Sequence, residues 1–558
     1  MEVVFECAGA SPGIKWSGRA AVGYDGLVWV EVTATPARAN AEISRLRLRA
    51  PVRNSKAILY SIAAAYPGGR SMPNAPAQGG RLPKEGWAGA PVPQIWVGNY
   101  ELGVALYAHE PVEQDPGVSG DAMRLDTSQL LIVEMQMDFI RRPTALQKPR
   151  TFRFGLQPTP ARPRSDRPEP RRMAPLSLAE DNAERHLQKL AESGAELILI
   201  EGARTQPGGA ALIREEDAAR AERIVAAAHR LGLKAILTIP LQRPDTAGAT
   251  TALVDTGIRL TSQFAEQFVE RLDRAMNDMA LDGICLDTRR FTAAPLLERR
   301  AFHERLYRML HSKAEAQGIL YIVSSDPALF IFDAFADVRL CGTEHYDALA
   351  RHGAVRRRLP DLDSRLPADR YLASTGVAAL GRQPAFSLLR PDGAPPLSVL
   401  QGADNRHATT DELLTIHESF ALAGLLNMHV AAPPEAAEFG KCLALQSQLW
   451  ELEDRLMPLS PRVLGYWQTP QYLRTEPLGP VQVSAWIASG DRALLHVANL
   501  TAKRRRATVK FLPQSGYRDP AELEILATAV PDGGSAEASG DTITCDLPPN
   551  GFIRLLVE

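Results

Sequence analysis

The run ELILIEG at residues 196–202 has the near-continuous apolar character of a strand buried on both faces. A helical segment, REEDAARAERIVAAAHRLG at 214–232, follows it and stops at a glycine. The run KAILTIP at 234–240 is the next strand, and a second helical segment occupies 261–279. Strands that alternate with helices of this length predict a parallel sheet covered by helices.

The alternation continues along the chain. DGICLDT at 282–288, ILYIVSSD at 319–326 and DVRLCGTEH at 337–345 resemble strands, and YLASTG at 371–376 and LLNMHVA at 425–431 are weaker candidates. The length of this region favours a (β/α)8 barrel of the TIM type over an open doubly wound sheet. Neither G-x-G-x-x-G nor G-x-x-x-x-G-K-[ST], the phosphate loops that would support an open sheet, occurs in the chain.

Segments rich in β-structure flank the barrel on both sides. Short alternating runs bounded by turn residues predict an N-terminal β-sandwich over residues 1–157 and a C-terminal β-sandwich over 459–558. Dense proline marks a linker at 158–175, and the catalytic barrel is expected at 176–458. The predicted fold class is therefore multidomain, α/β plus all-β, with a central barrel between two sandwiches.

The charge balance excludes some partners. The 558 residues contain 63 Lys and Arg against 65 Asp and Glu, so no basic excess indicates nucleic acid. We find no apolar stretch long enough to span a bilayer. We therefore expect no nucleic acid and no membrane as partner, and we leave a homo-oligomer open. A neutral surface is compatible with a neutral, polar partner such as a carbohydrate substrate, and with many others.

The five cysteines are far apart and show no zinc spacing, so we predict neither a metal site nor a cofactor. The first residues, MEVVFECAGA, lack the pattern of a signal peptide. This favours either a cytoplasmic protein or a secreted protein that has been processed or truncated.

In a parallel barrel the active site forms at the carboxyl ends of the strands. Asp287 and Glu344 are the main catalytic candidates there, and Glu201 is the third. Glycoside hydrolysis needs one acid to protonate the leaving oxygen and a second group that acts as nucleophile, base or orienter. The polar residues near these strand ends that we expect to bind substrate are Arg204, Arg289, His345, Tyr346, Asp326 and His429.

Each candidate also has a plainer structural interpretation. Asp287 can pair with Arg289 or Arg290, and Glu201 can pair with Arg204. Asp326 precedes a proline and is better suited to cap a helix.

Tryptophans are candidates for a platform under a sugar ring. Trp87, Trp96 and Trp467 would serve if they are exposed, whereas Trp29 and Trp486 lie in alternating strands and are expected in the core.

Several motifs resemble one family. In the N-terminal region they are YDGLVWVEVTATP (24–36), LRLRAPV (46–52), IWVGNYELGVALYAHE (95–110) and FRFGLQPTPARP (152–163); in the barrel they are DGICLDTRRF (282–291) and FADVRLCGTEHYD (335–347). These segments resemble the glycoside hydrolase family 123-like bacterial proteins. That resemblance implies a β-sandwich, a catalytic barrel and a C-terminal β-domain.

The resemblance also implies a retaining hydrolase that acts on a 2-acetamido sugar. An adjacent Asp-Glu pair serves this family: the Asp orients the acetamido group, whose oxygen attacks the anomeric carbon, and the Glu is the general acid. The matching positions here are Asp287 and Thr288, so the Asp is kept and the second acid is absent. Either Glu344 or Glu201 supplies the acid, or the protein is a lyase or transglycosylase, or it binds carbohydrate without catalysis.

Overall fold

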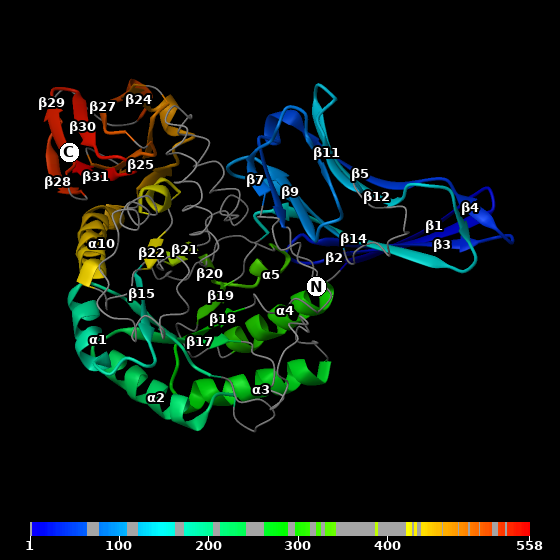
Figure 1. Cartoon of the computed structure of the whole chain (residues 1–558), viewed down its shortest axis with the longest axis horizontal. Helices are drawn as coiled ribbons and strands as arrows, with labels where there is room; N and C mark the ends of the chain where they lie inside the picture. The colour runs from blue at the N-terminus through cyan, green and yellow to red at the C-terminus, as the bar shows by residue number, and fades with distance from the viewer. Residues whose placement is uncertain are drawn as a thin grey trace.

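The computed structural model describes residues 3–63, 78–108, 121–161, 172–204, 212–240, 262–287, 296–312, 320–324, 330–341, 385–388, 420–426, 429–431, 437–459, 461–477, 479–488, 492–501, 503–515, 523–530 and 533–558. Within these residues, an all-β N-terminal part, a parallel sheet with helices and an all-β C-terminal part follow one another along the chain (Figure 1). The two all-β parts lie away from helices α1 (Ala183–Glu192), α2 (Glu215–Arg230) and α3 (Ser262–Asp278).

The N-terminal part is a sandwich of two antiparallel sheets. The larger sheet has the order β1 (Val3–Ser11), β2 (Ile14–Val22), β3 (Val28–Pro36), β14 (Arg150–Thr159), β10 (Gly103–Ala108), β9 (Gln94–Gly98), β6 (Leu59–Ala63), β7 (Gln78–Arg81). The smaller sheet has the order β5 (Leu46–Arg53), β12 (Ile132–Ile140), β11 (Met123–Asp126), β8 (Trp87–Gly89), and a short pair joins β13 (Thr144–Leu146) to β4 (Ala41–Ile43). Alternating side chains of both sheets, such as Val97, Leu106, Met135 and Met137, bury one shared core, as the alternating sequence predicts.

The central part has eight parallel strands that are neighbours in sequence order. They are β15 (Met173–Ser177), β16 (Leu197–Glu201), β17 (Lys234–Pro240), β18 (Gly283–Asp287), β19 (Leu320–Ser324), β20 (Val338–Cys341), β21 (Ala385–Leu388) and β22 (His429–Ala431). Further helices of this part are α4 (Leu296–Ser312), α5 (Phe330–Asp333) and α10 (Ala437–Leu456). Parallel order throughout agrees with the βα repeats of the sequence.

The two faces of the parallel sheet bury different cores. Ile198 and Ile200 of β16 belong to a core shared with helices α1 to α4. Leu197 and Leu199 of the same strand belong to a separate small cluster, whose members are Met173, Leu197, Leu199, Ile236, Cys285 and Val338 from five strands. In addition, Cα atoms of β15 and β22, the first and last strands, come within 8 Å of each other. The sheet is therefore curled, with the face that carries this small cluster inside; within the described residues no helix packs on that face.

Three strand boundaries differ from the sequence prediction. β15 begins at Met173, within the expected linker at 158–175, and β14 runs on to Thr159. Proline hid β15, although Pro175 is tolerated because β15 pairs with β16 alone among the described strands. The chain is still helical at Leu425, so the last strand shortens to β22. β21 was not predicted, and the predicted strand at 371–376 lies outside the described residues.

The C-terminal part is a second sandwich. One sheet has the order β23 (Arg462–Leu464), β25 (Val481–Ile487), β26 (Ala493–Asn499), β31 (Phe552–Val557), β28 (Ile525–Ala529), and the other β24 (Leu473–Glu476), β27 (Arg505–Phe511), β30 (Thr542–Leu547), β29 (Ser535–Ser539). Val483, Leu495 and Val509 lie in the core between them.

A buried ion pair joins the N-terminal sandwich to helix α4. The Asp25 side chain is fully buried, and Arg300 donates to it over 2.9 Å from Nη2 to Oδ1. Gln157, of the quoted FGLQ run, also donates to Asp25 and accepts a hydrogen bond from the Tyr107 hydroxyl. A Cβ at Gly155 of the same run would lie 2.8 Å from the Trp29 ring, so glycine makes room for that side chain. The run therefore builds this domain junction.

A second junction ties the C-terminal sandwich to the central part. Arg554 donates to Glu453 of α10 over 2.6 Å, and both side chains are buried. The His496 ring contacts the backbone oxygen of Ala421 at 3.0 Å. Burial and the nearby Arg554 charge lower the pKa of His496 to about 3.

We expect Arg300→Met to lower the free energy of unfolding by about 3 kcal/mol, because it leaves a buried carboxylate without its cation. Urea unfolding at pH 7 measures this. Arg305→Met on the same helix is the control, because Arg305 pairs with Glu266 at the surface over 3.5 Å; it should cost less than about 1 kcal/mol. Equal losses in the two variants would contradict the assignment.

We also expect His496 to make the fold sensitive to acid. The unfolded chain binds a proton at this residue below a pH of about 6.5, whereas the folded chain keeps it neutral. The contribution of neutral His496 to the free energy of unfolding is therefore fully present above a pH of about 6.5. It falls as the pH drops below that value, by at most about 1.4 kcal/mol per pH unit. The free energy of unfolding should change less steeply with pH, between about pH 6.5 and 5, in His496→Gln than in the control variant His229→Gln. The His229 ring is partly exposed.

Candidate active site

The carboxyl edge of the parallel sheet carries two of the predicted acids. Glu201 is the last residue of β16 and Asp287 the last residue of β18, as expected from the sequence. Asp287 is in register with Pro240 on one side and with Ser324 on the other. The register continues from Ser324 through Leu340 and Phe386 to His429. His429, a predicted substrate ligand, thus shares a row with Asp287 although the two lie four strands apart.

Glu201 lies two residues closer to the amino ends of the strands than the row of Asp287. It is in register with Ser177, and Ile200 before it is in register with Leu237. The next residue of β17, Thr238, is in register with Cys285, two positions before Asp287. Glu201 is 5% exposed and Ser177 is fully buried.

Two polar residues at this edge were missed by the sequence analysis. Ser177 accepts a hydrogen bond from the backbone N–H of Ala179. The hydroxyl of Thr238 is buried and has no hydrogen-bond partner within the described part of the chain. Ser177 ends a strand whose first residues were taken as linker, Thr238 lies inside an apolar strand, and the register between strands is what reveals both.

Arg204 follows β16 and contacts the start of helix α2. Its Nε and Nη2 atoms donate to the two carboxylate oxygens of Asp217 over 2.9 and 2.8 Å, its backbone N–H donates to the same carboxylate, and Glu216 is a further partner. Burial opposes ionisation of Asp217, but these hydrogen bonds outweigh it and hold the pKa of Asp217 below its ordinary value. Arg204 therefore fastens the loop after β16 to α2, and its contact with substrate stays a prediction.

The other predicted site residues either lie outside the described residues or are placed by their backbone alone. Arg289, Asp326, Glu344, His345 and Tyr346 lie outside the described residues. Asp287 and His429 are placed by their backbone alone. Their roles stay predictions.

Asp282, just before β18, marks the opposite edge of the sheet. Its carboxylate accepts a hydrogen bond from the backbone N–H of Ala235 and contacts His229 of α2, both over 2.8 Å. This acid holds strands and helix together at the amino ends, as expected for the stability face of such a sheet.

The tryptophans divide into core and surface. Trp29 and Trp486 are buried, which confirms the prediction for both. Trp96 is also buried and donates to the Thr159 hydroxyl, so it is a core residue and the platform prediction was wrong for it. Trp467 is partly exposed and stacks on Tyr100 of the N-terminal sandwich with ring centroids 4.9 Å apart.

Across the described ranges, no group of three His, Cys, Asp or Glu side chains is arranged to hold a metal ion. The same residues contain no helix with the length and apolarity needed to cross a bilayer.

A double-mutant cycle separates the two roles of Arg204. Arg204→Met and Asp217→Asn should each lower the free energy of unfolding by about 1 kcal/mol and should not be additive, because they remove the same contact. If Arg204 also binds substrate, Arg204→Met lowers kcat/KM more than Asp217→Asn does. Equal effects of the two on kcat/KM would remove Arg204 from the substrate ligands.

Comparisons with known proteins give remote structural likenesses alone. No family model matches the chain and no curated protein matches it, so the resemblance to family 123-like proteins stays a prediction. Among solved structures, the chain is similar to an alpha-galactosidase from Lactobacillus brevis, with 10% identity over 98% of this chain and 85% of that one and a TM-score of 0.45. The chain is also similar to an alpha-amylase from H. orenii, with 11% identity over 70% of this chain and 99% of that one and a TM-score of 0.44. A beta-L-arabinopyranosidase from Geobacillus stearothermophilus has 12% identity over 70% of this chain and 96% of that one, with a TM-score of 0.42. The identity to each of these glycoside hydrolases is 12% or less, and each TM-score is below 0.5.

Proposed function

We propose that the chain is a glycoside hydrolase whose parallel sheet closes into a (β/α)8 barrel with the active site at the carboxyl ends of its strands. Three features support closure: eight parallel strands in sequence order, the approach of β15 to β22, and a small core on the helix-free face. An open parallel sheet needs helices on both faces, whereas a closed barrel fills its interior with its own side chains.

The observation that carries the proposal is the pair of acids, Glu201 and Asp287, at the carboxyl edge of one sheet. They are two strands apart, about 10 Å, and offset by two residues, about 7 Å, and curling of the sheet shortens the first distance. Carboxyl groups about 5 to 10 Å apart across a sugar ring are what glycoside hydrolysis needs. Glu344 follows the end of β20 by three residues in the sequence, and we expect it at this edge as well.

The finer proposal follows the family resemblance. A retaining reaction on a 2-acetamido sugar would use the substrate's amide oxygen to attack the anomeric carbon, with Asp287 orienting the amide. Thr288 cannot protonate the leaving oxygen, so that role goes to Glu344 or Glu201.

A catalytically inactive carbohydrate-binding protein is the second candidate. The observation that favours it is Thr288, which stands where the resembling family has its general acid. It would bind sugar at the same strand ends without turnover.

Substitution of the acids tests the roles. Asp287→Asn and Glu344→Gln should each lower kcat by about 100-fold or more with the fold intact, because each removes a group that acts in proton transfer or orientation. Glu201→Gln decides whether the third acid takes part. Asp282→Asn, at the opposite end of β18, is the matched control and should affect stability more than kcat. Full activity in both Asp287→Asn and Glu344→Gln would reject the assignment.

The substrate class is tested by a screen of aryl glycosides with and without a 2-acetamido group, followed by NMR of the anomeric product. Cleavage of acetamido sugars alone, with retention, supports the substrate-assisted mechanism. Cleavage of other sugars means that two protein carboxylates do the chemistry, and an unsaturated product that absorbs in the near ultraviolet identifies a lyase. Tight binding of sugar with no product supports the inactive protein.

A further inference from the structure

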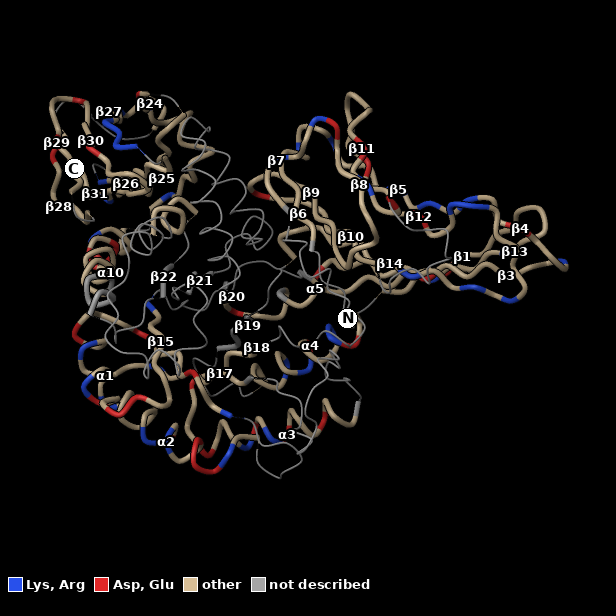
Figure 2. The backbone as a smooth tube through the Cα atoms, in the orientation of Figure 1, with Lys and Arg blue, Asp and Glu red and all other residues tan. Residues whose placement is uncertain are grey.

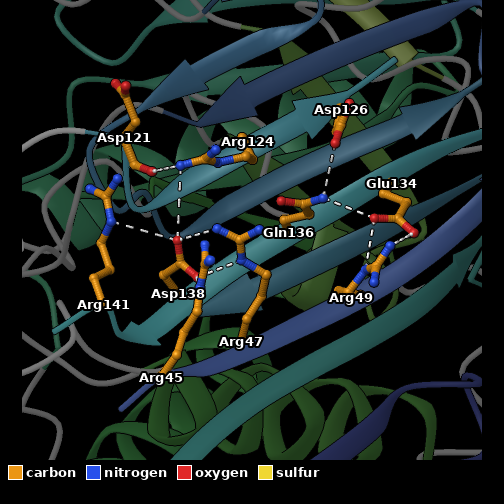
Figure 3. Close-up of polar contacts among 10 residues, drawn as sticks. All are labelled: Arg45, Arg47, Arg49, Asp121, Arg124, Asp126, Glu134, Gln136, Asp138 and Arg141. Atoms are coloured by element: carbon orange, nitrogen blue, oxygen red, sulfur yellow. Dashed lines mark hydrogen bonds and ion pairs between the residues drawn. The ribbon is translucent and has the colours of Figure 1, made fainter. Parts of the chain in front are cut away.

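The smaller sheet of the N-terminal sandwich has a polar outer face. Strand alternation sends Leu48 and Met135 into the core, and it places Arg47, Gln136 and Asp138 on the other side, which Figure 3 shows in close-up. Basic residues also mark this sheet along β5 in Figure 2, where the sequence has Arg47, Arg49 and Arg53. The inward residues fill the core on their own, so the core does not explain why the outward residues are charged.

Four guanidinium groups converge on one carboxylate of this face. The Asp138 side chain is 1% exposed, and Arg47 donates to both of its oxygens over 2.6 and 2.8 Å. Arg45, Arg141 and Arg124 approach the same carboxylate at 3.5, 3.6 and 3.9 Å, which is beyond good hydrogen-bonding distance. Arg124 also interacts with the Asp126 carboxylate and donates to the backbone oxygen of Asp121. Four positive charges therefore face two carboxylates, Asp138 and Asp126, which leaves a local surplus of two.

This surplus is local. Arg49 on the same face has its own acid, because it donates twice to Glu134. Over the whole chain, basic and acidic residues are nearly equal in number. Guanidinium groups held close together repel one another unless an anion lies between them, and the planar guanidinium matches carboxylate and sulfate oxygens.

A second observation points to a polar ligand beside the arginines. Gln136 is 4% exposed, and its amide nitrogen donates to both Asp126 and Glu134. The two carboxylates require the nitrogen on that side, so the amide oxygen faces away, and it has no donor within the described residues. Arg124 is directly opposite Gln136 on β11, and its Nε has no acceptor there either. A hydroxyl group between them would accept a hydrogen bond from Arg124 Nε and donate one to the amide oxygen of Gln136.

We propose that the cluster of Arg45, Arg47, Arg124 and Arg141 binds an acidic glycan through a carboxylate or sulfate, with a neighbouring sugar hydroxyl at Gln136. The choice of a glycan rests on the proposed function; the anion site itself rests on the geometry alone. A nucleic acid is disfavoured because the four arginines gather on one spot, whereas a phosphate backbone needs an extended basic track.

Inorganic sulfate tests the anion site without any sugar. Sulfate should raise the Tm of the full chain more than chloride at equal ionic strength, because it binds the folded state. The double variant Arg45→Gln/Arg141→Gln should show a smaller difference than the wild type, because it retains only the general stabilising effect of sulfate. It keeps Arg47, which holds Asp138. Arg53→Gln, an exposed arginine on the same face of β5, is the matched control and should keep the full difference. An equal response to sulfate in all three proteins overturns the proposal.

Glycan binding is then measured by titration calorimetry with polygalacturonate, chondroitin sulfate and neutral dextran. At least one acidic polymer should bind, dextran should not, and the double variant should bind about tenfold more weakly or worse, since each lost guanidinium removes a charge-assisted hydrogen bond. The control variant should match the wild type. Unchanged binding by the double variant, or binding of a DNA oligomer but of neither acidic polymer, overturns the assignment to a glycan.

Asp287→Asn distinguishes this proposal from the proposed function. It should leave binding of the acidic polymer intact, and the double arginine variant should leave hydrolysis of small aryl glycosides intact. Loss of polymer binding in Asp287→Asn would place the acid-binding site at the strand ends and overturn its place on this sheet.

Discussion

The buried carboxylate of Asp25 is the constraint on which the arrangement of domains depends. Placing it in a dry interface is costly unless it is paired, and its partners, Arg300 and Gln157, come from two different parts of the chain. The same interface contains Trp29, Trp96 and Phe332 in one hydrophobic core that extends to Trp486 of the C-terminal sandwich. The three parts of the molecule are therefore joined by one continuous interior, so the sandwiches are held firmly against the sheet that carries the candidate site.

Much of this fold was predictable from local pattern. ELILIEG became β16 and KAILTIP became β17 because a continuous apolar run between helices has few other solutions. β15 was missed because its proline suggests a linker, and its pairing with β16 is visible only in the structure. The burial of Trp96 was also invisible, since its hydrogen bond to Thr159 joins residues 63 positions apart.

Part of the candidate site was also predictable from local sequence pattern. A carboxylate at the end of an apolar run, as at Glu201 or Asp287, is visible in the sequence, and parallel topology brings such ends to one edge. The row that links Asp287 to His429, and the position of Thr238 two residues before that row, depend on pairing between strands that no local pattern contains. The same limit applies to Arg204, whose partner Asp217 lies on the following helix.

The junction at Asp25 also bears on how the protein is made. Asp25 precedes Arg300 by 275 residues. At ordinary rates of translation the ribosome needs roughly 15 to 55 seconds to cover that distance. During that interval the N-terminal sandwich has its strands but lacks the cation for its interface, and Trp29 and Trp96 lack the later residues, such as Leu296 of α4, that belong to the same core. A chaperone that recognises apolar surface has its target on this domain until α4 emerges.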